Sequence, residues 1–322
     1  MACFAVCSIN MSDTFIRIPF TKAEGTQNDF VVVDDRKASY PETVRRSFAQ
    51  AICHRRRGVG ADGAIFIDEH PTKSFTMSFF NPDGSDGSMC GNGGRCALLF
   101  ATTLMPLEGT THFEAVGDPY SGTVNGRVVR LHFPAPKNIE LHRTIEMDGV
   151  SLQVHYLDVG AEHAVVFVND NPTLQRQEFN GLDVDGLGRA IRNHPAFGPK
   201  GANANFVLVD GDRLKYRTFE KGVEAETQSC GTGAIASAIA AKFVHDLDAP
   251  IDLITNGGDS LRVGFAVDQQ TNIQAETHTV PGDSVSDVYF EGEANLVFQG
   301  DVFYNPETGR LSTPKIADAL LD

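Results

Sequence analysis

Two cysteines share unusual surroundings and are the strongest candidates for chemistry in this chain of 322 residues. Cys90 opens the sequence CGNGGRC and Cys230 opens CGTGA, so a Gly-x-Gly pattern follows each cysteine. An acidic residue, Asp86 or Glu226, stands four positions ahead of each one. The two copies lie 140 residues apart (230 minus 90), which is nearly half of the chain. This spacing predicts two pseudo-equivalent halves, each presenting one thiol.

The start of a helix carries unpaired N–H groups and a partial positive charge, so it can bind a carboxylate and lower the pKa of a neighbouring thiol. If two such helix starts face each other, a small carboxylate substrate fits between them with one thiol on each side. One cysteine, as thiolate, would remove the proton α to the carboxylate, and the other would deliver a proton to the opposite face. The helix ends would stabilise the developing negative charge. This chemistry is racemisation or epimerisation without a cofactor.

Packing is the main alternative, because a buried cysteine is most often a small apolar residue of the core. Two glycine-flanked cysteines are hard to explain in that way, since glycine lowers helix stability without filling space. A phosphate-binding loop is disfavoured, because neither stretch ends in the Gly-Lys-Ser/Thr that such a loop needs.

The elements that must position the thiols can be predicted from the flanking sequence. GNGGRCALLFATTLM follows Cys90 and GTGAIASAIAAKFVHDL follows Cys230, and both are apolar nearly all round and too short to cross a membrane. A helix that is apolar on every face must be enclosed by protein. We therefore expect each half to be a curved sheet wrapped around one buried helix.

Most of the remaining chain reads as short β-strands, rich in β-branched and aromatic residues and separated by Gly, Asn, Asp and Pro. The predicted strands are 30–35, 63–68, 76–80, 127–133, 163–168, 205–210 and 214–219. Amphipathic helices are predicted at 41–56 and 181–193. The expected class is α/β (α+β), with mainly antiparallel sheet.

Composition limits the possible partners. The chain is 41% hydrophobic and 21% charged, which suffices for a substantial core and favours two domains. The formal net charge is −15, and the one basic run, Arg55-Arg56-Arg57, is too short to follow a phosphate backbone. Nucleic acid is therefore not expected as a partner, and a membrane is not expected because nowhere do eighteen apolar residues run together. The expected partner is the small-molecule amino-acid substrate of the cysteine site.

The beginning of the chain, MACFAVCSINMSDTF, lacks the basic region and cleavage site of a signal peptide, so a cytoplasmic location is expected. Met11 is a possible initiator, in which case the first ten residues are a disordered appendage or a misassigned start, and residues 1–13 are expected to be a disordered extension. The cysteines form no CxxC grid, so neither a disulfide framework nor a metal site is predicted. They are Cys3, Cys7, Cys53, Cys90, Cys96 and Cys230.

Six motifs in this order resemble those of the pyridoxal-independent diaminopimelate epimerases. They are GTQNDFVVVD (25–34), RRGVGADGAIF (56–66), FNPDGSDGSMCGNGGRC (80–96), NANFV (203–207), FEKGVEAETQSCGTGA (219–234) and GEANLVFQG (292–300). The resemblance implies cofactor-independent epimerisation of LL-2,6-diaminopimelate to the meso form, for lysine and peptidoglycan synthesis. It also implies two domains of related fold, with the substrate in the cleft between them, and favours a homodimer. The expected domains are 14–134, with the returning strand 297–305, and 135–296, followed by a tail at 306–322.

The resemblance also implies roles for individual residues. Cys90 and Cys230 correspond to the acid/base pair, and His163 and Glu220 to polar residues that assist the thiols. The residues implied to bind substrate are Asn28, Asn81, Gly91, Asn92, Asn203, Lys221, Gly231 and Thr232. From the residues alone, Asn81 could equally be a turn residue, Asn28 could cap a strand, and His163 could be a strand-edge histidine bonded to a carbonyl.

This chain departs from the family pattern at two places. Ala161 and Glu162 stand where Asn-Pro commonly precedes the histidine, and Lys221 replaces an arginine that could clamp a carboxylate at two points. Both changes concern the far end of the substrate and leave the proton transfer intact. Racemisation of another amino acid is therefore one alternative, although Asn92 disfavours a proline racemase, which usually has histidine there. A relative that uses the two thiols as a reversible disulfide is the other.

Overall fold

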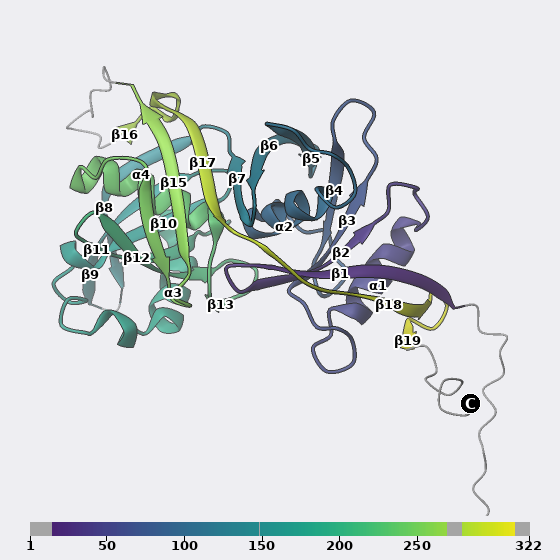
Figure 1. Cartoon of the computed structure of the whole chain (residues 1–322). Coiled ribbons are helices and arrows are strands. Elements are labelled where there is room, and N and C mark those ends of the chain that lie inside the picture. Colours follow the sequence, from purple (N-terminus) through teal and green to yellow (C-terminus); the bar gives the residue numbers. More distant parts are fainter. Residues whose placement is uncertain (1–14, 148, 269–278, 313–322) are drawn as a thin grey trace, which may run out of the picture.

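A computed structural model describes residues 15–147, 149–268 and 279–312, and it consists mostly of β-sheet with a few helices (Figure 1). The helices are α1 (Glu42–Ile52), α2 (Gly91–Ala101), α3 (Val184–Arg192) and α4 (Gly231–His245), with short 3-10 turns at Val168–Asp170, Phe179–Gly181, Pro195–Phe197 and Gly282–Ser284. The expected extension at residues 1–13 lies outside the described part of the chain.

The two halves of the chain contain corresponding strands. The first half holds β1 (Ile16–Gly25), β2 (Asn28–Asp34), β3 (Gly63–Asp68), β4 (Phe75–Phe80), β5 (Thr111–Ala115), β6 (Asp118–Asn125) and β7 (Val128–His132). The second holds β8 (Asn138–Met147), β9 (Val150–Asp158), β10 (Glu162–Phe167), β11 (Asn203–Asp210), β12 (Arg213–Glu220), β13 (Ala225–Thr227), β14 (Ile251–Thr255), β15 (Ser260–Val267), β16 (Thr279–Val280) and β17 (Val285–Glu293). The chain then returns in β18 (Asn295–Asn305) and β19 (Arg310–Ser312).

The strand pairings repeat in the same order in both halves. From β1 to β7 each strand pairs with the next, in the order antiparallel, parallel, antiparallel, parallel, antiparallel, antiparallel. The series β9, β10, β11, β12, β14, β15, β17 repeats that order. Each pair of parallel strands is connected by a segment that contains one α-helix, which is the usual connection between parallel strands. The predicted pseudo-symmetric architecture is therefore confirmed, and α2 and α4 occupy equivalent places in it.

Within the described ranges, strand pairing joins the two halves at two places. β7 pairs with β17 of the second half, and β18 crosses back to pair with β1 along most of its length, from Ile16 opposite Tyr304 to Glu24 opposite Asn295 (Figure 1). β19 then pairs with β18, and it lies within the segment 306–322 that the sequence suggested was a tail.

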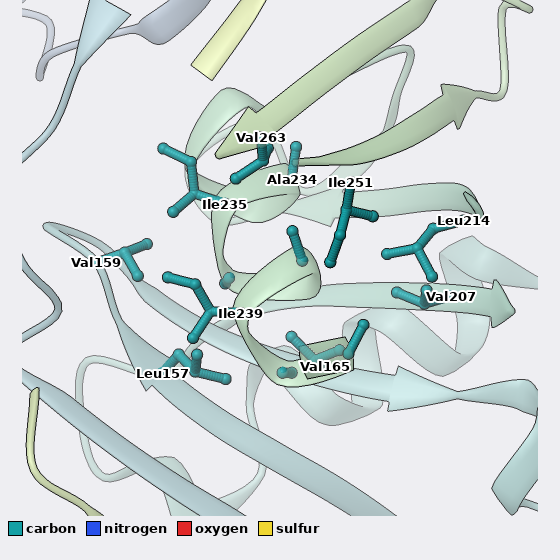
Figure 2. Close-up of a cluster of buried hydrophobic side chains, with 14 of the residues drawn as sticks. Leu157, Val159, Val165, Val207, Leu214, Ala234, Ile235, Ile239, Ile251 and Val263 are labelled. Carbon is teal, nitrogen blue, oxygen red and sulfur yellow. The ribbon is translucent and has the colours of Figure 1, made fainter. Parts of the chain in front are cut away.

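Helices α2 and α4 form the centres of the two cores, as their apolar sequences predict. All eleven residues of α2 are buried, and so are most of the first eleven of α4. Figure 2 shows Ile235 and Ile239 of α4 among side chains from the surrounding strands, including Leu157 and Val165. The sheets thus hold each helix, and the cysteine in front of it, in one orientation.

The seven predicted strands correspond to β2, β3, β4, β7, β10, β11 and β12, and the two amphipathic helices to α1 and α3. α1 ends at Ile52 instead of residue 56, because the chain turns at Cys53 and packs Gly58 against the end of the helix. A side chain at Gly58 would lie 2.4 Å from the carbonyl oxygens of Ala51 and Ile52.

Candidate active site

Both cysteines stand immediately before the first residue of a buried helix. Cys90 is the N-cap residue of α2 and Cys230 that of α4, each with extended backbone geometry. The two helix starts meet: a Cβ atom built on Gly91 would lie 3.6 Å from the Cα of Gly231, and one built on Gly231 would lie 3.4 Å from the Cα of Gly91. The first N–H groups of an α-helix have no partner within the helix, so both sets of donors converge on one region.

The two halves are also hydrogen-bonded across this junction. The Asn92 side-chain amide donates to the Ser229 carbonyl oxygen at 3.3 Å, directly ahead of Cys230. The ring of Phe290 lies 3.2 to 3.3 Å from the Cβ positions of Gly91 and Gly231, so it closes one side of the junction. Larger residues in place of the two glycines would push the helix starts apart.

Cys90 is hydrogen-bonded to residues of its own half. Its thiol donates to Asn28 Oδ1 at 3.5 Å, and its sulfur accepts from the Gly93 N–H at 3.4 Å. Asn28 in turn donates from Nδ2 to Asp62 at 2.7 Å, which fixes the orientation of the amide so that its oxygen faces the thiol. Asn28, at the start of β2, therefore contacts the cysteine instead of merely capping a strand.

Cys230 lies at the end of a chain of hydrogen bonds from the second half. Its sulfur is 3.4 Å from Thr232 Oγ1, and this hydroxyl is 3.0 Å from His163 Nε2. Nδ1 of His163 lies 3.1 Å from the Asn205 amide nitrogen. Asn205 Oδ1 accepts from Thr218 at 3.0 Å, so its amide nitrogen must face the histidine. His163 is then a neutral imidazole that donates from Nε2 to Thr232, whose hydroxyl can donate to the sulfur.

Glu220, at the end of β12, is an acidic group whose charge acts on Cys230. Its carboxylate accepts a hydrogen bond from the Thr227 hydroxyl. Burial raises the pKa of Glu220, and burial together with the Glu220 charge raises the pKa of Cys230 well above its usual range. Burial also lowers the pKa of His163 to about 3, which agrees with the neutral imidazole.

The expectation that the helix starts lower the thiol pKa values is wrong for this structure. Burial raises the pKa of Cys90 to about 11, although the Gly93 N–H and the Arg95 charge act in the opposite direction. Loss of solvation is the larger effect because both sulfurs lie in enclosed surroundings. Sequence patterns do not reveal how dry a site is, so this outcome required the tertiary structure.

Asn203 and Lys221 form a second cluster next to the histidine and the glutamate. Asn203 donates to the Glu162 carbonyl oxygen at 2.9 Å and accepts from the Lys221 N–H at 2.8 Å. The Lys221 ammonium forms an ion pair with the Glu162 carboxylate at 2.6 Å. Two of the three residues that depart from the family pattern, Glu162 and Lys221, therefore neutralise each other.

Asn81 is the one predicted site residue whose hydrogen bonds, in the described part of the chain, stay within its own turn. Its amide donates to Ser85 Oγ at 3.0 Å and to the Asp86 carbonyl oxygen at 3.1 Å. These are the contacts of the turn residue that was the alternative interpretation.

Four polar residues at the junction were not selected from the sequence as site residues. Each of them is hydrogen-bonded to a predicted site residue. They are Asp62, Arg95, Asn205 and Tyr216, bonded to Asn28, Asn92, His163 and Cys230, respectively. Asn205 could have been found, because an asparagine in the middle of an apolar strand needs buried partners. Asp62 and Arg95 could not have been found in this way, since most of their partners come from distant parts of the chain.

The structure also has a groove away from the thiols. It has a volume of about 1230 Å³ and is lined by residues such as Arg36, Tyr40, His70 and Leu104 beyond the carboxyl end of α2. Within the described residues, the helices are all too short or too polar to cross a membrane.

Solved structures of known proteins share this fold. A hydroxyproline epimerase from Agrobacterium vitis matches with a TM-score of 0.65 at 15% identity, over 91% of this chain and 93% of that one. A methylitaconate-delta-isomerase matches with a TM-score of 0.61 at 12% identity, over 94% and 99%. At these identities the likeness concerns the fold alone, and it places the chain in the fold class shared by these isomerases.

Sequence comparison identifies the family within that class. The sequence model of diaminopimelate epimerase matches residues 20–117 and 155–280. The diaminopimelate epimerase of Aquifex aeolicus is 35% identical over 294 residues, covering 87% of this chain and 96% of the relative. That of Chlorobaculum tepidum is 34% identical over 286 residues, covering 86% and 98%. The chain belongs to the diaminopimelate epimerase family.

Proposed function

We propose that the protein catalyses the cofactor-independent epimerisation of LL-2,6-diaminopimelate to meso-diaminopimelate, with Cys90 and Cys230 as the two bases. The observation that carries this proposal is the contact between the starts of α2 and α4, because it brings two cysteines and two sets of helix N–H donors to one place. Membership of the family and the names of its relatives supply the substrate.

The reaction is a transfer of protons at one carbon. The thiolate sulfur removes the proton from the α carbon, and the electron pair of the broken C–H bond moves into the carboxylate. The helix N–H groups, together with Gly91, Asn92, Gly231 and Thr232, would stabilise the resulting charge. The opposite thiol then gives its proton to the other face of the carbon, so the two sulfurs exchange protonation states. No oxidant, reductant or other group is consumed.

The polar neighbours of Cys230 assist this exchange. Thr232, held by the neutral His163, can donate a hydrogen bond to the sulfur when it is a thiolate. Glu220 favours the protonated thiol through its charge. These opposing influences keep Cys230 able to both give and accept a proton.

The far end of the substrate is assigned to the cluster of Asn203, Lys221 and Glu162. Lys221 would attract the distal carboxylate, and Glu162 would attract the distal ammonium group. Diaminopimelate carries both charges on its distal carbon, so a matched pair of opposite charges is a suitable partner. Asn81 stays a candidate for the same end of the site.

The direct test is to incubate the purified protein with LL-diaminopimelate in D2O, under reducing conditions and without added cofactor. NMR should show deuterium entering the α position together with formation of the meso isomer. If the folded, reduced protein catalyses no exchange, the disulfide-forming alternative is favoured. If it exchanges lysine, histidine or proline but not diaminopimelate, the reaction type stands and the substrate changes.

We also propose that the protein acts in the cytoplasm as a homodimer, and that its domains are 14–134 with the returning strand 297–305, and 135–296. Similarity to the diaminopimelate epimerases supports both points. Light scattering during gel filtration would measure the oligomeric state, and a monomeric mass would contradict the dimer.

A further inference from the structure

Arg95 is a fully buried cation on α2, one turn after Cys90. Its guanidinium donates to Asn92 Oδ1 at 2.8 Å, to Thr26 Oγ1 at 2.6 Å and to the Glu293 carbonyl oxygen. All three acceptors are neutral. Within the described residues Arg95 takes part in no ion pair, and its Nε has no hydrogen-bond partner.

Glu24 and Asp259 are the carboxylates whose charges act on Arg95, but both are hydrogen-bonded to other residues. Glu24 accepts from Asn295 and from the Gln27 N–H, and Asp259 accepts from the Gln27 side chain at 2.8 Å. Burial lowers the pKa of Arg95, but an arginine stays protonated at neutral pH. A buried charge without an opposite charge is unfavourable for folding, so its presence beside an active site suggests a function.

The surrounding backbone is shaped around this side chain. A Cβ atom at Gly292 would lie 2.7 Å from Arg95 Nη1, and one at Gly25 would lie 3.2 Å from Nη2. The ring of Phe290 stacks on the guanidinium, with its centroid 4.8 Å from Cζ. The same Phe290 ring contacts the starts of both buried helices. Arg95 is therefore held in a fixed place behind the junction.

Arg95 also decides which way the Asn92 amide points. Because Oδ1 of Asn92 accepts from the guanidinium, its nitrogen must face Asn28 Oδ1 at 3.4 Å and the Ser229 carbonyl oxygen at 3.3 Å. Asn28 contacts the Cys90 sulfur, and Ser229 precedes Cys230. One guanidinium thus orients contacts that reach both thiols.

We infer that Arg95 is a positioning residue of the active site: it fixes the Asn92 amide that joins the two helix starts, and its unpaired charge favours an anion at the start of α2. The anion is the Cys90 thiolate or the reacting carboxylate. Cys90 is then the more acidic of the two thiols, because Arg95 lies on the same helix and its charge acts on Cys90, whereas the Glu220 charge disfavours a thiolate at both sulfurs. This inference rests on the proposed function for its catalytic part, but the effect on the thiol can be measured without substrate.

In the part of the chain that the structure describes, few charged and titratable groups act on Cys90, so the effect of Arg95 can be isolated. Glu220 of β12 acts on Cys90 from the opposite half, and Cys230 faces it from α4. Cys96 lies on the same helix as Arg95, and Asp62 lies behind Asn28. None of these changes when Arg95 is replaced.

The test uses the full chain with Cys3→Ser, Cys7→Ser and Cys230→Ala, in which Cys90 is the reactive thiol. Burial raises the pKa of both other cysteines, to about 12 for Cys53 and still higher for Cys96, so these react slowly. The rate of Cys90 alkylation by iodoacetamide is measured from about pH 7 to pH 10, with the modified peptide identified by mass spectrometry. Arg95→Met should lower this rate at least about tenfold at a given pH and shift the profile upward by about one unit or more.

Arg95→Lys separates the two parts of the inference. Lysine keeps the charge but cannot make the same set of hydrogen bonds, so alkylation of Cys90 should follow nearly the wild-type pH profile. In the chain with both active-site cysteines, epimerase kcat/KM should nevertheless fall about tenfold for Arg95→Lys and about a hundredfold or more for Arg95→Met. Arg45→Met is the matched control, because Arg45 pairs with Asp35 and Asp68 on the far side of the first half. It should lower the melting temperature and leave the alkylation profile unchanged.

An unchanged alkylation profile in folded Arg95→Met would overturn the inference. Arg95→Gln, which keeps hydrogen-bond donors without the charge, replaces Arg95→Met if the latter does not fold. If neither uncharged variant folds while Arg45→Met does, Arg95 serves folding and the inference is also overturned. If the wild type does not epimerise diaminopimelate but the alkylation profile shifts as expected, the proposed function fails and the effect of Arg95 on the thiol stands.

Discussion

The two thiols have different neighbours, although their sequence motifs match. Cys90 contacts an amide oxygen and a backbone N–H, whereas Cys230 contacts a hydroxyl that a neutral histidine holds. An enzyme that works on two mirror-related faces needs two bases but does not need them to be identical. The asymmetry in this structure comes entirely from the residues around the sulfurs.

Replacing either cysteine tests their role against simple packing. Cys90→Ala and Cys230→Ala should each lower kcat/KM by at least about 10³-fold, because one of the two proton transfers loses its base. Both variants should keep the free energy of unfolding within about 1.5 kcal/mol of wild type, since each loses a single sulfur atom. Deuterium exchange and thermal unfolding measure the two effects. A large loss of stability with residual activity would support the packing role instead.

The pH dependence follows from the pKa of Cys90. A thiol with a pKa of about 11 is thiolate to roughly one part in 10³ at pH 8, and this fraction rises about tenfold per pH unit below the pKa. We expect kcat/KM to increase between about pH 7 and pH 9. His163, with a pKa of about 3, should add no inflection near its ordinary value. An inflection near pH 6.5 that disappears in His163→Gln would contradict this assignment.

Glycines in the first turns of the two buried helices allow these turns to lie close to neighbouring residues. Gly233 in α4 lies against β11 and β12, where a Cβ atom would be 2.4 Å from both Asn205 Oδ1 and the Tyr216 hydroxyl. Tyr216 also donates to the Cys230 carbonyl oxygen at 3.0 Å. The glycine therefore allows the start of the helix to approach the polar residues that orient the histidine.

Gly233→Ala should force this part of the helix away from its strand. We expect a loss of about 1–3 kcal/mol in the free energy of unfolding and a clear loss of activity, because Asn205 holds His163. Gly181→Ala is the control, since a Cβ atom there would have open space and the backbone is not in the left-handed region. Chemical unfolding and deuterium exchange compare the two variants, and equal stability for both would count against the argument.

The last strands of the chain connect the second half of the molecule back to the first. β18 crosses from the second half to pair with β1 of the first, so the relative placement of the two helix starts depends on residues near both ends of the chain (Figure 1). Tyr304 of β18 is fully buried against Phe48 of α1, with ring centroids 5.5 Å apart. Among the described residues its hydroxyl has no hydrogen-bond partner.

Two substitutions of Tyr304 should have opposite effects. Tyr304→Ala should cost about 3–5 kcal/mol in the free energy of unfolding, because it removes a buried ring. Tyr304→Phe should be neutral or slightly stabilising, since it removes a buried hydroxyl without a partner. The folded fraction of each should keep the wild-type kcat, measured below the melting temperature. A destabilised Tyr304→Phe would show that the hydroxyl has a partner after all.

Local patterns in the chain were enough to find the two thiols, the buried helices behind them and many of the strands. Those features depend on residues that are neighbours in the sequence. A helix that is apolar on every face must be enclosed by protein, and glycines after a cysteine leave backbone N–H groups accessible to a ligand. The repeated motif was also sufficient to predict two equivalent halves. The site residues that could be named singly, such as His163 and Glu220, came from the resemblance.

Contacts between distant residues came only from the folded chain. Asn92 meets Ser229 across 137 positions, and Lys221 meets Glu162. Arg95 contacts Thr26 and the backbone of Glu293, near opposite ends of the chain, and has no acidic partner among the residues that the structure describes. These contacts depend on how the sheets pack around the helices, and the spacing of residues along the chain does not predict that packing. The thiol pKa values belong to the same group, because burial, not the helix start, controls them.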